Sequence, residues 1–486
     1  MFVKSVRFSS LGWGLFPAFA VVLASMASAQ TADLPSSPAP NYSSKTNPYF
    51  GSVTTQPATD EVLNLSLDDA VRRGLETNLG LKQAEESEKS LHGQKDVAFQ
   101  YFLPSITVTG GHGYHEYNLA AYGFGHGLVI PGGPPEGFPL ITKANVTLGQ
   151  VNYEQTLFSG TYINGYKAVK AAEQSAFFAK QSARGEVVQQ VATAYLGVIA
   201  AQSEVENAKA LMDADKVLFD QARAQHEAGT MANLDELRAR VQYQQQQQIV
   251  VANENKREKA EILLKREIGI APGQKINLTD PAPYNELAAR TPDELKAEAY
   301  ANRQDYQNLQ AQERETRMVL GARKAERYPT LSFKGNYGVT GVTGVGYHGT
   351  FSAIGTLTVP IFKEGTLRGD TEVAKAQLDG VTVQLGDMRG RIDQQVRSAL
   401  LDVQAAQKLV EVSRSNVDLA SRALSDQTDR FNAGIDDTLP LVRAQSTLQS
   451  AQSNLVESLY QFNLAKLGLA RSAGVIELQY RTYLGR

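Results

Sequence analysis

Small and apolar residues recur at alternating steps of four and three between Ile392 and Phe431. This heptad spacing is typical of a helix that packs along one stripe against another helix. No proline or glycine interrupts the stretch, and Ala433-Gly434 follows it as a helix stop. A second stripe runs from Leu441 to Leu469. The two stripes predict a long antiparallel helical hairpin with its tip near Gly434.

The same pattern occurs earlier in the chain and indicates an internal repeat. When the stripe is moved back by 205 positions it runs from Val187 to His226, and the tip falls on Gly229. Gly229 and Gly269 are also as far apart as Gly434 and Gly474. Equal spacing at several landmarks argues against two unrelated coiled coils.

The return helix of the first hairpin has a weaker pattern. Leu234, Leu237 and Val241 begin a stripe, but the run from Gln244 to Gln248 dilutes it. A glutamine run on a helix indicates either a solvated face or the wall of a wet channel. The sequence leaves these two interpretations open.

Each half also carries a helix and a pair of strands ahead of its long hairpin. Ser66 with Asp69 is a helix start, and Thr291-Pro292-Asp293-Glu294 is a stronger one. Pro104 and Pro329 end these helices. Alternating apolar and polar residues then predict β-hairpins at about 105–158 and about 330–361, each with one apolar face.

These patterns divide the chain into segments. Residues 1–29 are a predicted signal peptide, because Lys4 and Arg7 precede a short apolar run and Ala27-Ser28-Ala29 fits a cleavage site before Gln30. The remaining segments are an extended N-terminal segment (30–61), the first repeat (62–270), a linker (271–290), the second repeat (291–475) and a C-terminal tail (476–486). No cysteine is available for a lipid anchor or a disulfide, so stability must come from packing.

Composition and motifs exclude several classes of function. The net charge of −3 gives no support to nucleic-acid binding. We find no nucleophile elbow, no H-E-x-x-H and no phosphate-binding loop, so we predict no catalytic residue, no cofactor and no enzyme. Residues Gly344–Gly349 fit G-x-G-x-x-G but fall at a hairpin turn. The loop histidines (His112, His115, His126 and His348) are expected to be ordinary loop residues and not a metal site.

The lengths of the elements indicate what they do. A continuous helix from Gly365 to Gly434 would be about 100 Å long at ~1.5 Å per residue, which suits a device that crosses a wide gap. Strands of about ten residues with one apolar face are long enough to cross an outer membrane. Four strands cannot close a barrel, and open edges are not tolerated in lipid. Either several chains share one barrel, or the strands are not in lipid.

The chain resembles TolC-like outer-membrane efflux proteins over about 62–475. The residues that carry the resemblance are the duplicated plan, the paired prolines, Pro360-Ile361-Phe362 with Gly365, and the tips His226–Gly229 and Phe431–Gly434. The resemblance implies a mainly helical fold with membrane strands. It implies a homotrimer in which a shared twelve-stranded β-barrel continues as a twelve-helix tunnel through the periplasm. The implied location is the bacterial outer membrane, with outer-membrane lipid around the barrel.

The resemblance also implies partners and a function. The channel would be a passive exit duct of a tripartite efflux or type I secretion system, docked to a periplasmic adaptor and an inner-membrane transporter. In this family the adaptor contacts the hairpin tips. The matching positions here are Ala228, Gly229, Thr230, Ala433, Gly434 and Ile435. The substrate, whether drug, metal or protein, is not indicated.

The predicted gate departs from the family pattern. Where acidic ring residues align just after the second tip, this chain has Pro440 and Arg443. The gate candidates are Asp235, Glu236, Phe431, Asp436, Asp437 and Arg443. We hypothesise that salt links from Arg443 to Asp235, or to the partner subunit's Asp437, hold the tube shut, in place of a simple acidic ring. The alternative is a solvated charge cluster at a helix tip.

A periplasmic adaptor or scaffolding coiled coil without a pore is the rival function. Such proteins also contain long helical hairpins. They usually carry one hairpin flanked by compact β domains, whereas this sequence predicts two hairpins and a cleavable signal.

Overall fold

The computed structural model describes residues 49–54, 57–122, 140–281, 283–433, 435–436 and 438–485. The predicted signal peptide and much of the extended N-terminal segment lie outside these residues. Pro48–Arg486 forms one compact unit, and the description that follows concerns this unit. It is mainly helical with one four-stranded sheet, which confirms the predicted fold class.

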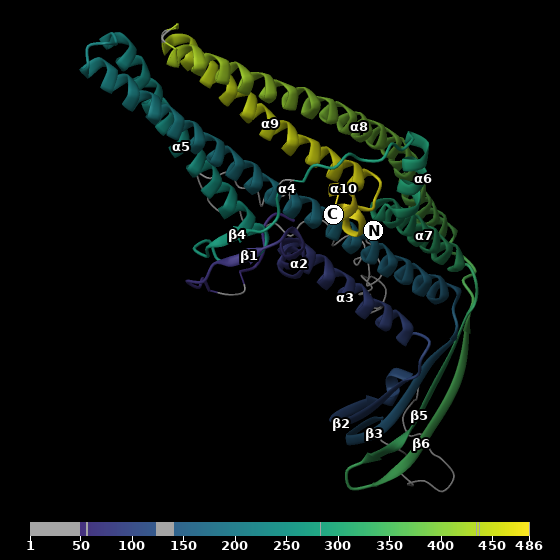
Figure 1. Ribbon diagram of the computed structural model, residues 1–486. Helices are drawn as coiled ribbons and strands as arrows, with labels where there is room; N and C mark the ends of the chain where they lie inside the picture. The colour runs from purple at the N-terminus through teal and green to yellow at the C-terminus, as the bar shows by residue number, and fades with distance from the viewer. Residues whose placement is uncertain are drawn as a thin grey trace, which may run out of the picture. The chain divides into compact units, whose positions relative to one another are not determined.

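Both halves have the same order of elements (Figure 1). The first half contains β1 (Leu63–Leu65), α2 (Leu67–Thr77), α3 (Leu79–Gln100), β2 (Ser105–Asn118), β3 (Ile141–Phe158), α4 (Gly160–Glu227) and α5 (Asn233–Glu267). The second half contains β4 (Ile276–Leu278), α6 (Pro292–Asn302), α7 (Gln304–Ala325), β5 (Thr330–Val342), β6 (Gly346–Thr358), α8 (Glu364–Asn432) and α9 (Thr438–Ser472). A last helix, α10 (Ile476–Leu484), and a 3-10 turn (Leu119–Tyr122) complete the described elements.

The predicted helix starts are present, but the helix that begins after Ser66 is not continuous. The Ser66 hydroxyl accepts a hydrogen bond from the Asp69 amide at 3.1 Å, and Thr291 forms a full capping box with Glu294. The chain breaks at Asn78, whose extended backbone ends α2 and whose side chain caps α3. An equivalent break occurs 225 positions later at Arg303, between α6 and α7.

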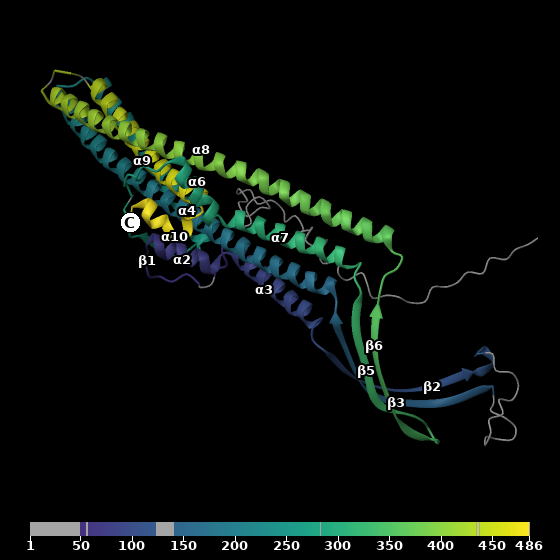
Figure 2. The same cartoon turned by 90° about the vertical axis from the view of Figure 1, so that its right-hand side faces the viewer.

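The heptad stripes of the second hairpin form its packing seam. In α8, Ile392, Val396, Val403 and Val410 are nearly inaccessible to solvent, and α9 packs along the part of α8 that is nearer the tip. Figure 2 shows α8 running beside α7 over one part of its length and beside α9 over the other. In α4, the equivalent stripe from Val187 to Ala222 is also buried or half-buried.

The stripe proposed for α5 was on the wrong face. Leu234, Leu237 and Val241 are exposed in this chain, whereas Ala239, Gln246 and Val250 face α4 and are buried. The buried set is the one obtained by moving the α9 seam back 205 positions. Repeat position therefore identifies the seam better than hydrophobicity does, because Gln246 occupies a buried seam position and donates from Nε2 to the carbonyl oxygen of Ala208 at 3.0 Å.

The predicted linker and C-terminal tail are both more structured than expected. β4 lies within residues 271–290 and pairs in parallel with β1. The C-terminal residues form α10, whose Tyr480 hydroxyl donates to an oxygen of Asp68 at 2.6 Å. An ion pair between Glu477 and Arg184 of α4 measures 2.6 Å. Ile476, Tyr480 and Leu484 of α10 also belong to the largest core cluster, in which Tyr195, Phe462 and Leu467 are fully buried.

A buried lysine anchors the linker to α9. Lys466 is 0% exposed, and its Nζ donates to the carbonyl oxygen of Asn285 at 3.1 Å. The same Nζ lies 4.5 Å from the centre of the Phe462 ring. Burial lowers the pKa of Lys466 to about 8, because desolvation disfavours the charged form.

Lys466 predicts a particular pH dependence of stability. Its pKa is lower in the folded state than in the unfolded state, so the unfolded chain binds more protons between about pH 8 and the ordinary lysine pKa. The free energy of unfolding is expected to rise by up to about 3 kcal/mol as pH increases through that window, and about 2 kcal/mol of this rise is expected by pH 9.5. Thermal unfolding of the detergent-solubilised protein at pH 7 and pH 9.5 measures this.

Lys466→Met should remove the pH-dependent increment, and Lys408→Met, at an exposed position on α8, should retain it. Equal pH dependence in the wild type and in Lys466→Met would contradict the assignment.

The sheet has strand order β2-β3-β5-β6 and is antiparallel throughout. The β3–β5 pairing joins the two halves of the chain. Within the described residues, β2 and β6 each pair on one side only, so the sheet has two open edges. In β6, Phe351 and Leu357 lie on one face, and Thr350, Ser352 and Thr358 lie on the other, as the alternation predicts.

The registers of the two β-hairpins are equivalent. Ser105 of β2 lies opposite Glu154 of β3. Moved by 225 positions, Ser105 becomes Thr330 of β5. Moved by 204 positions, Glu154 becomes Thr358 of β6. Thr330 and Thr358 are opposite each other in the structure.

Glycines end the helices of both hairpins. Gly229, Gly269 and Gly474 have φ angles of 76°, 70° and 79°, and the residue after each donates its amide to a carbonyl five positions earlier. This is the Schellman arrangement. Gly229 has open space around it, whereas a Cβ on Gly474 would lie 2.7 Å from the backbone nitrogen of Arg303.

None of the helices in the described part of the chain combines the length and apolarity needed to cross a membrane.

Candidate tunnel gate and hairpin tips

The first hairpin turns at Ala228, Gly229 and Thr230. Ala228 ends α4, Gly229 adopts the left-handed conformation, and the Thr230 amide donates to the Gln225 carbonyl oxygen at 2.9 Å. The Thr230 hydroxyl donates to the same carbonyl oxygen at 2.9 Å. All three tip residues are exposed, so the turn is closed by its own hydrogen bonds and leaves its outer surface available.

The second tip has the same cap. The Ala433 amide donates to the Asp429 carbonyl oxygen at 2.9 Å, and the Ile435 amide donates to that of Arg430 at 3.0 Å. Ala433 is exposed, and the Ile435 side chain is 66% exposed. Gly434 and Asp437 lie outside the described residues. The adaptor contact at both tips stays a prediction.

Asp235 joins the two hairpins near their tips. It lies in the first turn of α5, and its Oδ1 accepts a hydrogen bond of 2.8 Å from the hydroxyl of Thr438, the first residue of α9. The same oxygen is 3.1 Å from Nη1 of Arg238. Thr438 is 0% exposed, so the contact is sheltered on the α9 side. Thr438 was not among the gate residues proposed from the sequence.

The other two acidic candidates that the structure describes, Asp436 and Glu236, have partners within their own hairpins. Asp436 is 2.7 Å from Nε of Arg430 and accepts a hydrogen bond of 2.8 Å from Gln427. The Arg430 and Gln427 hydrogen bonds hold the pKa of Asp436 below its usual value. Glu236 lies 3.8 Å from Nε2 of His226. The described acidic candidates Asp235, Glu236 and Asp436 therefore each have a partner.

Phe431 packs in the interior of the four-helix region. It is 7% exposed and belongs to an apolar cluster with Leu218, Ala222, Ala239 and Leu441, which we call the tip cluster. These residues come from α4, α5, α8 and α9, so Phe431 helps to hold the two hairpins together.

The proposed salt link between Arg443 and Asp235 is absent from this chain. Arg443 is exposed, and no ion pair joins it to another described residue. Asp235 pairs with Arg238, which is three residues away on the same helix and therefore sterically closer. A link from Arg443 to the partner subunit's Asp437 stays a prediction.

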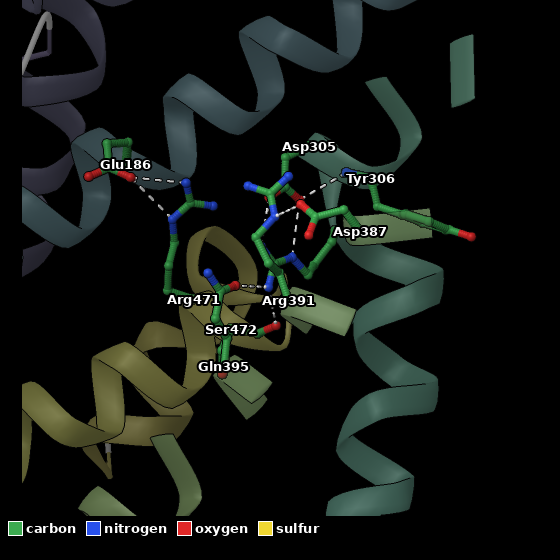
Figure 3. A network of polar contacts seen from close by, with 9 residues as sticks. Glu186, Asp305, Tyr306, Asp387, Arg391, Gln395, Arg471 and Ser472 are labelled. Carbon is green, nitrogen blue, oxygen red and sulfur yellow. Dashed lines mark hydrogen bonds and ion pairs between the residues drawn. The ribbon is translucent and has the colours of Figure 1, made fainter. Parts of the chain in front are cut away.

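A cavity of about 880 Å³ opens where α9 ends and α7 begins. Arg303 lies beside it and is 7% exposed. Its guanidinium donates to both carboxylate oxygens of Asp305, to Gln395 of α8 at 2.6 Å and to the carbonyl oxygen of Ser472 at 3.4 Å. Figure 3 shows this network, with Arg471 reaching Glu186 of α4. The network joins α4, α7, α8 and α9.

The charges of the network are mutually compensated. Burial of Asp305 would raise its pKa, but the hydrogen bonds and charge of Arg303 outweigh burial and lower it. Arg471 and Glu186 form an ion pair of 2.9 Å. The paired charges in the cavity wall therefore connect the four helices to one another.

The described residues hold no group of three or more side chains suited to a metal ion. His112 lies 2.8 Å from the hydroxyl of Thr147, and His115 stacks on Tyr117. His126 lies outside the described residues.

Comparison with known proteins identifies the class of fold. The chain is similar to a solved structure described as a membrane protein from Pseudomonas aeruginosa, with a TM-score of 0.71 and 19% identity over 84% of this chain and 93% of that one. It is 22% identical to nodulation protein T of Rhizobium leguminosarum bv. trifolii over 414 residues, or 82% of each chain. It is 24% identical to the toluene efflux pump outer membrane protein TtgC of Pseudomonas putida over 357 residues, 69% of this chain and 70% of the other.

The family model for outer membrane efflux proteins matches residues 70–269 and 295–475. The chain therefore belongs to the outer membrane efflux protein family, and it is an outer-membrane channel protein. The two matched stretches contain the two long helical hairpins described above.

Proposed function

We propose that this protein is the exit duct of a tripartite efflux or type I secretion system. Three copies would share a twelve-stranded barrel in outer-membrane lipid and continue it as a twelve-helix tunnel. The hairpin tips would dock to a periplasmic adaptor and, through it, to an inner-membrane transporter. The duct would be passive and would have no catalytic activity of its own.

The open four-stranded sheet is the observation that carries this proposal. Its strands are exposed on both faces, as Val108 and Phe351 illustrate on one face and Thr109 and Thr350 on the other. Unpaired backbone groups at β2 and β6 cannot remain in lipid, because no water is present there to hydrogen-bond them. Pairing β6 of one copy with β2 of the next removes both edges.

The helices also expose surfaces suited to another copy. Leu234, Leu237, Val241 and Val251 follow heptad spacing along the outer face of α5 and are all exposed. On α8, Leu401, Leu409, Val412 and Leu419 are exposed on a face away from the α9 seam. Two such stripes on one chain match the two neighbours that each member of a closed ring has.

Electron microscopy of the mature chain in detergent tests the proposal. Tapered tubes with threefold end views are expected, with a helical part about 100 Å long by the rise per residue. Thin rods or dimers without a barrel would refute it. Fractionation separates the proposal from the adaptor alternative, since an adaptor would follow the inner membrane or the soluble periplasm.

The contact between Thr438 and Asp235 is expected to restrain opening at the tips. Thr438→Val removes a hydrogen bond to a charged group, worth about 1–2 kcal/mol when partly sheltered. The open fraction in single-channel recordings should rise roughly tenfold.

Thr447→Val is the matched control for Thr438→Val. Thr447 is also on α9, is exposed, and donates only to the Arg443 carbonyl oxygen within its helix. If Thr438→Val has the same open fraction as the wild type, the contact between Thr438 and Asp235 does not restrain opening.

A further inference from the structure

A buried acid interrupts the seam of the first hairpin. Asp215 lies on α4, is 1% exposed, and occupies a heptad position that is Ala420 in the second repeat. Its neighbours on the same face of α4 are Leu211 and Leu218, both buried. A carboxyl group at such a position lacks the solvation that an exposed acid has.

Asp215 lies between two apolar clusters. Leu218 belongs to the tip cluster, and Leu211 belongs to a second cluster with Ala420, Leu448 and Ala451, which we call the inner cluster. Gln445 of α9 has the matching place, between Leu441 of the tip cluster and Leu448 of the inner cluster. Asp215 and Gln445 therefore lie at the same level between the two clusters, and Gln242 of α5 contacts Asp215. We call these three side chains the polar layer.

The layer has too few hydrogen-bond donors. Gln242 donates from Nε2 to Oδ2 of Asp215 at 3.3 Å. Among the described residues, Oδ1 of Asp215 and Oε1 of Gln445 are buried and have no hydrogen-bond partner. A neutral carboxyl group supplies an O–H donor to such a layer, whereas a carboxylate supplies none.

Charged groups on the surrounding helices do not compensate Asp215. On α4, Asp213, Lys216 and Asp220 are exposed. Charged side chains at similar levels of the other helices are also exposed or already paired: Arg238 with Asp235, Asp418 with Arg422 at 2.8 Å, and the exposed Arg240 and Arg443. Tyr243 of α5 stacks on Phe219. Burial raises the pKa of Asp215 to about 6, while the Gln242 hydrogen bond acts in the opposite direction.

We propose that Asp215, Gln242 and Gln445 form a proton-controlled latch that holds the two hairpins together near their tips. This inference rests on the proposed channel function and assigns it a regulatory step. With Asp215 protonated, its hydroxyl donates within the layer and the clusters on both sides stay packed. When the proton passes to periplasmic water, the carboxylate needs further donors, and opening the layer to solvent provides them.

The sign and size of the effect follow from the carboxyl group. The pKa of Asp215 is higher in the packed state than its ordinary value of 3.8. Protonation of Asp215 therefore stabilises the packed state fully below about pH 3.8, and this stabilisation is lost as pH rises through about 6. A difference of about two pH units corresponds to a change of up to about a hundredfold in the opening equilibrium.

Single-channel recording at periplasmic-side pH values from 5 to 8 tests the latch. The wild-type open fraction is expected to rise with a midpoint near 6. Asp215→Asn, which keeps the shape and cannot ionise, should stay at the low-pH level throughout. Asp220→Asn, at an exposed position on the same helix, should keep the wild-type rise. A pH step that persists in Asp215→Asn, or is absent from the wild type, would overturn the proposal.

Hydrogen exchange of the same proteins separates the latch from the channel. The amide exchange rate of α5 near Gln242 is measured in the wild type and in Asp215→Asn at each pH. The ratio of the two rates is used because the intrinsic effect of pH on amide exchange is the same in both proteins. That ratio should increase between pH 5 and pH 8. If no conducting channel forms, the proposed function fails, and a rising ratio still supports the latch. A constant ratio rejects the latch whether or not the protein conducts.

Discussion

Oxidation of the double variant Thr109→Cys/Thr358→Cys is expected to convert most of the protein into covalently linked trimers. Each copy would contribute one introduced thiol from the β2 edge and one from the β6 edge, so three disulfides would close a ring. The chain has no cysteine of its own, so any cross-link must involve the introduced pair. Non-reducing electrophoresis measures the yield.

The register for this prediction comes from the internal repeat. In the structure, Glu154 of β3 lies opposite Lys334 of β5, and their side chains form an ion pair of 2.6 Å. The shift of 204 that maps β3 onto β6 takes Glu154 to Thr358. The shift of 225 that maps β2 onto β5 takes Lys334 back to Thr109, which would lie opposite Thr358 in the next copy. Both threonines are on the polar face of the sheet. Directly opposite residues in antiparallel strands have Cα atoms about 4.5–5.5 Å apart, which a disulfide spans.

Two control pairs make the cross-link specific. Glu154→Cys/Lys334→Cys should form a disulfide within one chain and give no covalent trimer. Thr109→Cys/Ser352→Cys keeps the same face but is displaced by six residues, or about 20 Å, and should not cross-link. Equal trimer yields from the Ser352 and Thr358 pairs would contradict the register.

Gly474→Ala is expected to cause the largest loss of stability of any single substitution considered. The left-handed backbone costs a residue with a Cβ about 1–2 kcal/mol. The new Cβ would also lie 2.7 Å from the Arg303 nitrogen and 2.8 Å from the carbonyl carbon of Asn302, so backbone must shift at a further cost of about 1–3 kcal/mol. The total is about 2–5 kcal/mol.

Gly229→Ala is the matched control for Gly474→Ala. Its φ of 76° is nearly the same, but nothing lies within 4 Å of the added Cβ. It should lose only the backbone contribution, and that loss is local to the exposed tip. Thermal unfolding in detergent and the yield of assembled protein compare the two. Similar losses for both variants would show that close packing at Gly474 contributes little.

The helical seams were predictable from the sequence because packing between long helices repeats one local rule. Val191, Val403 and Leu448 satisfy that rule and are buried. Hydrophobicity misplaced the α5 seam, since its most apolar stripe, beginning at Leu234, is exposed in a single chain. The internal repeat predicts the α5 seam correctly, because Gln246 aligns with Ala451, which is buried in the α9 seam.

The candidate gate was less predictable than the fold. Asp235 was identified from its position after the tip, but its partners Arg238 and Thr438 depend on side-chain geometry and on the approach of α9. Asp215 could have been identified from the sequence, because it is an acidic residue at a seam position where the second repeat has alanine. The breaks at Asn78 and Arg303 depend on contacts with distant parts of the chain, including the close approach of Gly474 to Arg303.

The repeat shifts differ along the chain, and the difference has a practical consequence. The shift is 225 for β2 and β5 but 204 for β3 and β6, so the length change between the halves falls in the connection between the strands of each hairpin. The helical hairpins keep a constant shift of 205. A residue inserted into α4 would rotate every later seam position by about 100°. A peptide tag inserted between Leu119 and Leu140 would rotate none of them, which makes this connection the natural place for an affinity handle or an antibody epitope.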